Sequence, residues 1–324
     1  MKERLNFLKQ LMEKVNFLYT SLEEMIKRQR KIVVFIKYLL FLIVVIYFLK
    51  LVYEIKDKIV SYIFNIHLPF AGIAILCIFL SFIIYTMIWH LTLLFLGKGL
   101  PFLTLFKINI VSLFLRYLPG GVGDHIGRYA MLSQRGVEKK ITIFSIGLLA
   151  GMLVFAGILF FFMIHPFPLF HHFGEISNVT FIIGILVVLF ILFAPKIIKY
   201  ILNTSPFGYK EIIFLLILSL LHWILWGTGA FYSVKAIHPI SYNLWLKVVS
   251  IGVISWVIGF LTPFAPNGIG VRELVFIFLL KEIVPYPIAV SSSLFFRGVG
   301  IASDILYGVL ILPVFLFLKR RRQE

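Results

Sequence analysis

Six apolar runs, each long enough to form a helix that crosses a lipid bilayer, constrain this chain more than any other feature. A transmembrane helix needs about 20 predominantly apolar residues. Hydrophobic residues make up 61% of the chain and charged residues only 14%, more apolar surface than a soluble globule could bury. The sequence therefore predicts an all-α polytopic membrane protein with about six full spans, at residues 32–53, 69–96, 141–164, 179–194, 211–235 and 288–318.

The net charge of +17 comes from Lys and Arg that lie mostly in short segments between the apolar runs. There they orient the spans and contact anionic lipid headgroups, so no nucleic-acid partner is expected. Cys77, the single cysteine, lies within an apolar run. The histidines lack the spacing of a helical zinc site, and neither a catalytic triad pattern nor a phosphate-binding loop occurs. We therefore expect no metal ion, no cofactor and no enzymatic activity.

Both ends of the chain are basic. Residues 1–31 place apolar side chains at intervals of three and four among Lys, Arg and Glu, which is the pattern of an amphipathic helix. We interpret them as a cytoplasmic arm at the membrane surface, with a partner-binding coiled coil as the alternative. Residues 32–318 form the predicted transmembrane domain, and residues 319–324 form a basic tail that is also cytoplasmic by the positive-inside rule. The predicted location is the cytoplasmic membrane of a bacterium or archaeon.

Two glycine-rich motifs interrupt the apolar pattern. PGGVGDHIGR occupies residues 119–128 and TPFAPNGIGVRE occupies residues 262–273, with the same spacing of proline, glycine, apolar residue and glycine. Each lies in a composite segment, 101–136 or 244–285. The proline ends one helix, the glycines permit a turn, and the restarted helix presents free N–H groups that suit an anion such as phosphate. Alternatively, the glycines only allow close helix packing and Asp124 is an ordinary N-cap.

The distribution of positive charge favours a re-entrant course for both segments. If 101–136 enters from the cytoplasm and returns to it, Lys139 and Lys140 stay inside, and the loop 165–178, which contains no Lys or Arg, falls outside. Segment 244–285 then enters from the outer face and returns to that face. Such a pair is typical of an inverted-topology repeat, and these repeats build substrate sites near the bilayer midplane from broken helices.

The two motifs also resemble the membrane domain of the lysylphosphatidylglycerol synthetase/flippase family, and the resemblance covers roughly residues 30–318. In the two-domain members, this domain is held to move an aminoacylated phospholipid between leaflets after a C-terminal synthase domain has made it. The resemblance implies the same membrane fold and lipid movement here. The sequence ends in KRRRQE without such a synthase domain, so aminoacyl transfer is not expected and the lipid need not be lysylated.

Charged residues in an apolar context cost about 2.5–3.5 kcal/mol each at the bilayer centre on insertion scales, so each is expected to be paired or functional. Arg297 and Asp304 are seven residues apart in one predicted helix and therefore share a face. Arg272 starts a restarted helix, where a cation needs compensation from Asp124, from Asp304 or from a lipid phosphate. The candidate substrate-binding residues are Arg116, Gly120, Gly121, Gly123, Asp124, Arg128, Asn267, Gly268, Gly270, Arg272, Glu273, Arg297 and Asp304.

Three functions are compatible with these features. The first is a flippase-like transporter that moves a phosphate-bearing lipid, either a phospholipid or a polyprenyl-linked lipid, between leaflets; membrane lipids, anionic or phosphate-bearing, are then its partners. The second is a membrane enzyme that acts on a lipid-linked substrate, with Asp124, Glu273 or Asp304 as acid or base. The third is a membrane scaffold for an envelope-synthesis partner that docks on the N-terminal arm. A homo-oligomer is compatible with each of them.

Overall fold

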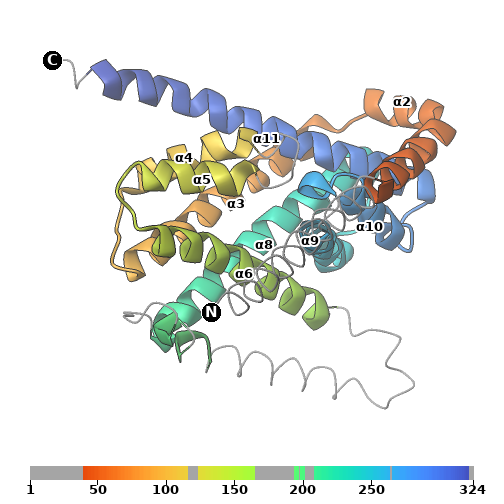
Figure 1. Cartoon of the computed structure of the whole chain (residues 1–324). Helices are drawn as coiled ribbons and strands as arrows, with labels where there is room; N and C mark the ends of the chain where they lie inside the picture. Colours follow the sequence, from red (N-terminus) through yellow and green to blue (C-terminus); the bar gives the residue numbers. More distant parts are fainter. Residues whose placement is uncertain are drawn as a thin grey trace, which may run out of the picture. The chain divides into compact units, whose positions relative to one another are not determined.

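The structure is a computed structural model (Figure 1). The chain divides into two compact units, residues 1–47 and 48–324. Every regular element in the described part of the chain is a helix, which confirms the all-α prediction. The predicted arm at residues 1–31 lies outside the described residues. The residues described are 39–115, 123–164, 193–196, 198–200, 208–262 and 265–320, and side chains of the last helix are described as far as residue 309.

Five stretches of the described residues are long and apolar enough to cross a membrane. They are α3 (Leu68–Phe95), α6 (Lys139–Ile164), α8 (Tyr209–Ile237), the stretch Tyr242–Leu261, and the portion Tyr286–Val309 of α11 (Tyr286–Arg320). The first three and the last confirm the predicted helices at 69–96, 141–164, 211–235 and 288–318. Local chemistry explains their starts: α3 has a proline in its first turn, and α8 begins where the Glu211 carboxylate accepts the Gly208 N–H at 2.7 Å.

The remaining predicted spans are described only in part. Residues 39–54 are helical and precede α2 (Lys56–Phe64), whereas most of the predicted span 179–194 lies outside the described residues. The stretch Tyr242–Leu261 consists of the turn η2 (Tyr242–Leu244) and α9 (Trp245–Leu261). Its 20 residues are enough to cross a membrane by length and composition, although the charge distribution predicts a re-entrant hairpin for it. The re-entrant course of this segment therefore stays a prediction.

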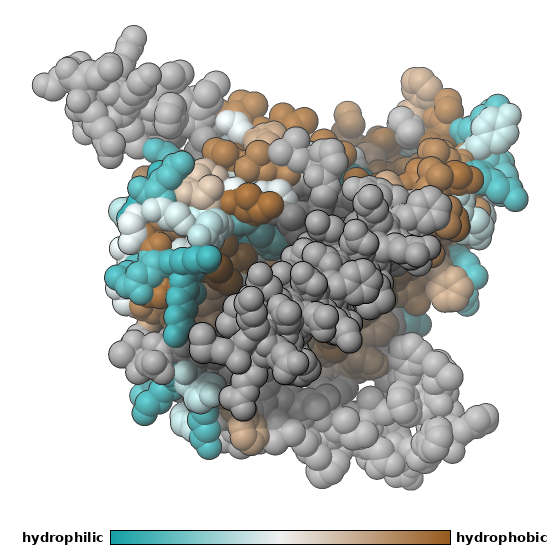
Figure 2. All heavy atoms as spheres, in the orientation of Figure 1, coloured by the Kyte–Doolittle hydropathy of each residue, from teal (hydrophilic) through white to brown (hydrophobic). Residues whose placement is uncertain are grey.

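The described surface carries apolar side chains that a soluble protein would bury. Leu76, Ile217 and Phe278 are 55%, 56% and 63% exposed. Figure 2 shows hydrophilic side chains gathered at the left and upper right margins of this face, with hydrophobic side chains between them. Lipid tails are as apolar as these side chains, so exposure to hydrocarbon carries no hydrophobic penalty. The long apolar helices and this surface identify an integral membrane protein.

Helices α3 and α8 form the centre of the second unit, where they pack along each other and both contact α11. Gly229 of α8 lies so close to α3 that a Cβ atom there would be 3.2 Å from the carbonyl oxygen of Ala74. The indole N–H of Trp223, which is fully buried, donates to the Leu153 carbonyl of α6 at 2.9 Å. Because hydrocarbon offers no alternative partner to such a group, this hydrogen bond fixes α8 against α6.

Two pairs of packed helices carry the glycine motifs. Helix α4 (Phe102–Leu115) packs against α5 (Gly123–Ser133), and α9 packs against α10 (Val271–Leu280) after the single turn η3 (Pro266–Gly268). At 1.5 Å per residue, α5 and α10 are roughly 15 Å long, about half the thickness of the hydrocarbon core. Each is therefore too short to cross the membrane alone, as the broken-helix interpretation requires.

Candidate functional site

The second motif makes a tight left-handed turn between α9 and α10. Asn267, Gly268 and Gly270 have φ angles of 52°, 66° and 83°, in the region that favours glycine and tolerates asparagine. Helix α10 then starts at Val271, where the Gly270 N–H donates to the Glu273 carboxylate at 2.7 Å. The predicted glycine turn and the restarted helix are both present, and Glu273 caps that helix as one half of a capping box does.

The same glycines accommodate the side chain of Arg272. A Cβ atom at Gly259 would overlap the Cγ atom of Arg272, and one at Gly268 would lie 2.7 Å from its Nε atom. The guanidinium carbon of Arg272 lies 4.9 Å from the ring centre of Trp256, within cation–π distance. Trp256 was not among the predicted site residues, although its position three residues before Gly259 on α9 places both on one helix face.

Glu273 connects α10 to α11. Its carboxylate lies 3.5 Å from Nε of Arg297, and its backbone carbonyl accepts the Ser293 hydroxyl at 3.3 Å. The Glu273 side chain is 7% exposed and that of Arg297 is 25% exposed, so the ion pair is screened weakly by solvent. Arg297 is therefore paired with a charged residue of the segment that carries the second glycine motif.

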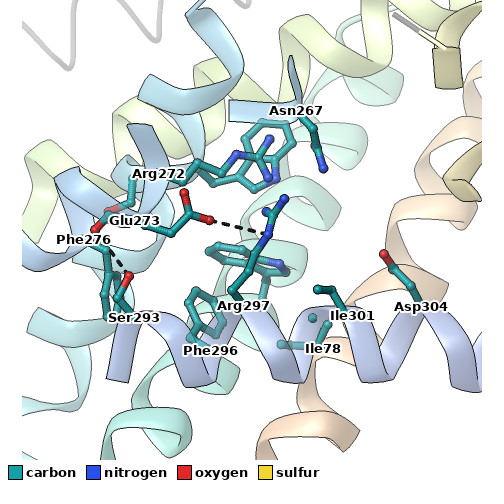
Figure 3. Close-up of a pocket in the computed structure, with 14 residues that line it drawn as sticks. Ile78, Asn267, Arg272, Glu273, Phe276, Ser293, Phe296, Arg297, Ile301 and Asp304 are labelled. Carbon is teal, nitrogen blue, oxygen red and sulfur yellow. Dashed lines mark hydrogen bonds and ion pairs between the residues drawn. The ribbon is translucent and has the colours of Figure 1, made fainter. Parts of the chain in front are cut away.

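A cavity of about 100 Å³ lies between α9, α10 and α11, with side chains from α3 and α8 closing its far side. It is lined by Asn267, Arg272, Glu273, Arg297 and Asp304, so the structure brings five of the predicted site residues together. Figure 3 shows Arg297 rising from α11 into the cavity, with Arg272 approaching from α10 and Asn267 opposite. The positive charges of the two arginines equal in number the negative charges of Glu273 and Asp304.

Predicted residues of the first motif form a separate cluster. Arg128 is 1% exposed and lies between the rings of Tyr85 and Trp89, at 5.2 and 5.5 Å from their centres. Its Nη2 atom is 3.7 Å from the Asp124 carboxylate, which also accepts the backbone N–H of His125 at 2.9 Å. Arg128 and Asp124 therefore combine a weak ion pair with cation–π contacts and line no part of the cavity described above.

The glycines of the first motif are partly described. Helix α5 begins at Gly123, where a Cβ atom would overlap the carbonyl oxygen of Leu115, so only glycine permits this approach of α5 to α4. Asp124 lies within the first turn of α5 and not at the N-cap position that the packing alternative assigned to it. Arg116, Gly120 and Gly121 lie outside the described residues.

Other groups in the described residues give no sign of metal chemistry: no three His, Cys, Asp or Glu side chains lie together there. The buried His222 is held instead by the protein backbone, since its Nδ1 atom lies 2.8 Å from the carbonyl oxygen of Ser81. The chemistry offered by the cavity is therefore that of guanidinium, amide and carboxylate groups.

Comparison with known proteins identifies a family for this chain. Residues 32–308 match the family described as the lysylphosphatidylglycerol synthase TM region, so the match includes both glycine motifs and the whole α9–α11 cavity. No curated protein matches the chain. The family is one of membrane proteins of the lipid-modification and flippase type, and its match covers most of the sequence. The chain therefore belongs to the family of lysylphosphatidylglycerol synthase transmembrane regions.

Proposed function

We propose that this protein moves a phosphate-bearing lipid between the leaflets of the membrane, and that the α9–α11 cavity receives the headgroup phosphate. The observation that carries this proposal is the convergence of Arg272, Arg297 and Asn267 on one cavity among helices long enough to cross a membrane. Guanidinium groups match phosphate oxygens with two parallel hydrogen bonds. A cavity of about 100 Å³ admits a phosphate group but no whole lipid, so the acyl or prenyl chains stay in the membrane.

The distribution of charge supports an anionic ligand. The Glu273 carboxylate is engaged by the Gly270 N–H and by Arg297. Asp304 lies two helical turns beyond Arg297 on α11, roughly 10 Å along the axis. The Arg272 and Arg297 guanidinium groups line the same cavity as the Asn267 amide. In a low-dielectric setting they attract a phosphate more strongly than they would in water.

The contacts of Glu273 favour transport over catalysis. A general acid or base must exchange a proton with its substrate, whereas this carboxylate caps a helix and holds an ion pair. We accordingly assign no enzymatic activity to the chain. In this mechanism Arg272 exchanges between protein partners and the lipid phosphate, so that its charge stays compensated while the headgroup moves.

The two hairpins enter from opposite faces in this mechanism and form an inverted repeat. This arrangement is supported by the equivalent starts of α5 and α10, at or directly after Gly123 and Gly270, which end the shared pattern of glycine, apolar residue and glycine, and by the short length of both helices. Broken helices of this kind surround substrate sites near the midplane in other transporter folds.

Lipid movement in reconstituted vesicles tests the proposal. Vesicles of phosphatidylcholine with a trace of fluorescent phosphatidylglycerol are bleached from outside with dithionite, and the bleached fraction reports exchange between leaflets. Arg272→Ala should abolish exchange, and Arg272→Lys should restore it only in part, because lysine lacks the planar fork. Arg135→Ala is the matched control, since Arg135 is exposed and donates to the Met131 carbonyl. Folded Arg272→Ala protein that exchanges lipid at the wild-type rate would overturn the proposal.

A further inference from the structure

Two aromatic rings of α9 touch both glycine-motif helices. Trp256 and Phe260 are stacked, with ring centres 5.0 Å apart and planes 7° from parallel. Arg272 of α10 lies over the Trp256 face at 4.9 Å. His125 of α5 meets Phe260 edge-on, at 6.4 Å between ring centres and 85° between planes. One residue from each motif therefore lies against a single aromatic stack.

His125 and Arg272 hold the same position in their motifs. Each is the second residue after the glycine that ends the shared pattern of glycine, apolar residue and glycine, Gly123 in one motif and Gly270 in the other, and each lies in the first turn of a restarted helix. The two residues therefore have equivalent positions in the sequence and similar surroundings in space: His125 contacts Phe260, and Arg272 contacts Trp256.

The two rings of the Trp256–Phe260 stack have different neighbours. On one side Trp223 meets Trp256 at 5.1 Å, and Trp223 is immobilised by full burial and by its hydrogen bond to the Leu153 carbonyl. On the other side His125 belongs to the first turn of α5. A stacked aromatic pair contributes about 0.5–1.5 kcal/mol beyond its buried area, so displacement of one ring relative to the other is opposed. The two rings thus connect His125 to the Arg272 guanidinium through successive contacts.

The position of His125 is in turn tied to a buried cation. Its Nε2 atom lies 3.8 Å from the Asp124 carboxylate, and the same carboxylate is 3.7 Å from Nη2 of Arg128. Arg128 is fixed between the aromatic rings of α3. The Asp124 carboxylate therefore links His125, which touches the stack, to Arg128.

We propose that His125 is a positioning residue for Arg272, acting through Phe260 and Trp256, and that headgroup binding at Arg272 is thereby coupled to the first hairpin. The inference rests on the proposed function for the identity of the ligand, but the coupling itself is a property of the lipid-free protein. Coupling of this kind is reciprocal, so a change at Arg272 must also be felt in α5.

Hydrogen exchange of α5 amides in detergent-solubilised, lipid-free protein tests the coupling directly. Arg272→Met should speed exchange in residues 123–133 about threefold or more, the change expected from loss of an aromatic or cation–π contact. In a Phe260→Leu background the same substitution should add nothing. Phe278→Leu, an exposed aromatic on α10, is the control and should leave the Arg272 effect unchanged. Additive effects of Arg272→Met and Phe260→Leu would overturn the coupling.

A second experiment measures the same hydrogen exchange after addition of dihexanoylphosphatidylglycerol. In the wild type the lipid should slow exchange in both α10 and α5, and His125→Leu should abolish the slowing in α5. His125→Phe, which keeps an aromatic edge against Phe260, should restore it. Protection of α10 without protection of α5 in the wild type would overturn the coupling and leave the proposed function standing. If the lipid protects neither helix, the proposed function is contradicted. The coupling is then tested by the lipid-free comparison of the Arg272→Met and Phe260→Leu variants.

Discussion

Replacement of Glu273 measures how far a buried ion pair supports the cavity. One carboxylate oxygen accepts the Gly270 N–H at 2.7 Å, and the other lies 3.5 Å from Arg297. Glu273→Gln keeps an acceptor for the Gly270 N–H but removes the charge. Loss of one partner from a buried ion pair costs about 3–5 kcal/mol, and the partial exposure of Arg297 places the expected loss at the lower end, about 3 kcal/mol.

Two further variants separate the contributions of the helix cap and of the ion pair to the stability that Glu273 provides. Glu273→Ala also removes the helix cap and should cost about 1 kcal/mol more than Glu273→Gln. The double variant Glu273→Gln/Arg297→Met leaves neither charge uncompensated. It should therefore recover most of the stability lost in Glu273→Gln, which makes the two substitutions strongly non-additive.

Reversible unfolding in detergent micelles gives the free energy of unfolding for each variant. Glu54→Gln is the matched control, because Glu54 pairs with Lys50 at 3.8 Å while both side chains are at least half exposed. An exposed pair of this spacing contributes about 0.5 kcal/mol or less. The reasoning is refuted if Glu273→Gln costs no more than Glu54→Gln, or if the double variant is as unstable as the sum of its parts.

Gly259→Ala should weaken binding of dihexanoylphosphatidylglycerol at least about fivefold, because a Cβ there overlaps the arginine stem, whereas Gly147→Ala has open space and should bind normally in calorimetry. Trp223→Phe removes a buried indole N–H from its backbone acceptor and should lower the free energy of unfolding by about 1–3 kcal/mol in the same micelle assay. Gln134→Cys in a Cys77→Ser background should resist an impermeant maleimide added to intact cells. Labelling from outside would contradict the predicted cytoplasmic location of the turn after α5.

The long helices could be predicted because a membrane leaves the backbone few choices. A run of about 20 apolar residues must satisfy its own N–H and C=O groups, so α3, α6, α8 and α11 follow from composition and length. The turn before α10 was also predictable, since only glycine and asparagine accept the left-handed angles found at Asn267, Gly268 and Gly270. These features depend on local chemistry alone.

The partners of the charged residues could not be predicted in the same way. From the sequence, Asp124, Asp304 and a lipid phosphate were all possible partners of Arg272. The ion pair between Glu273 and Arg297 depends on how α11 is rotated against α10, which the sequence does not reveal. The contact between Arg272 and Trp256 likewise requires Gly259 to bring two helices close together. Spacing along one helix predicts which residues share a face, and it contains no information on what the facing helix presents there.

Arg297 and Arg272 are held by different kinds of contact. Arg297 is held through its Nε atom by a carboxylate that is itself part of a helix start, so any large movement of Arg297 would also disturb the start of α10. Arg272 is supported by glycine backbone beneath its stem and by an indole face beneath its guanidinium. Stacking engages the face of a guanidinium and leaves its N–H groups directed along the plane, where they can change hydrogen-bond partners while the stack persists. Under the proposed function, Arg297 would define the position of the headgroup phosphate and Arg272 would follow the headgroup as it moves.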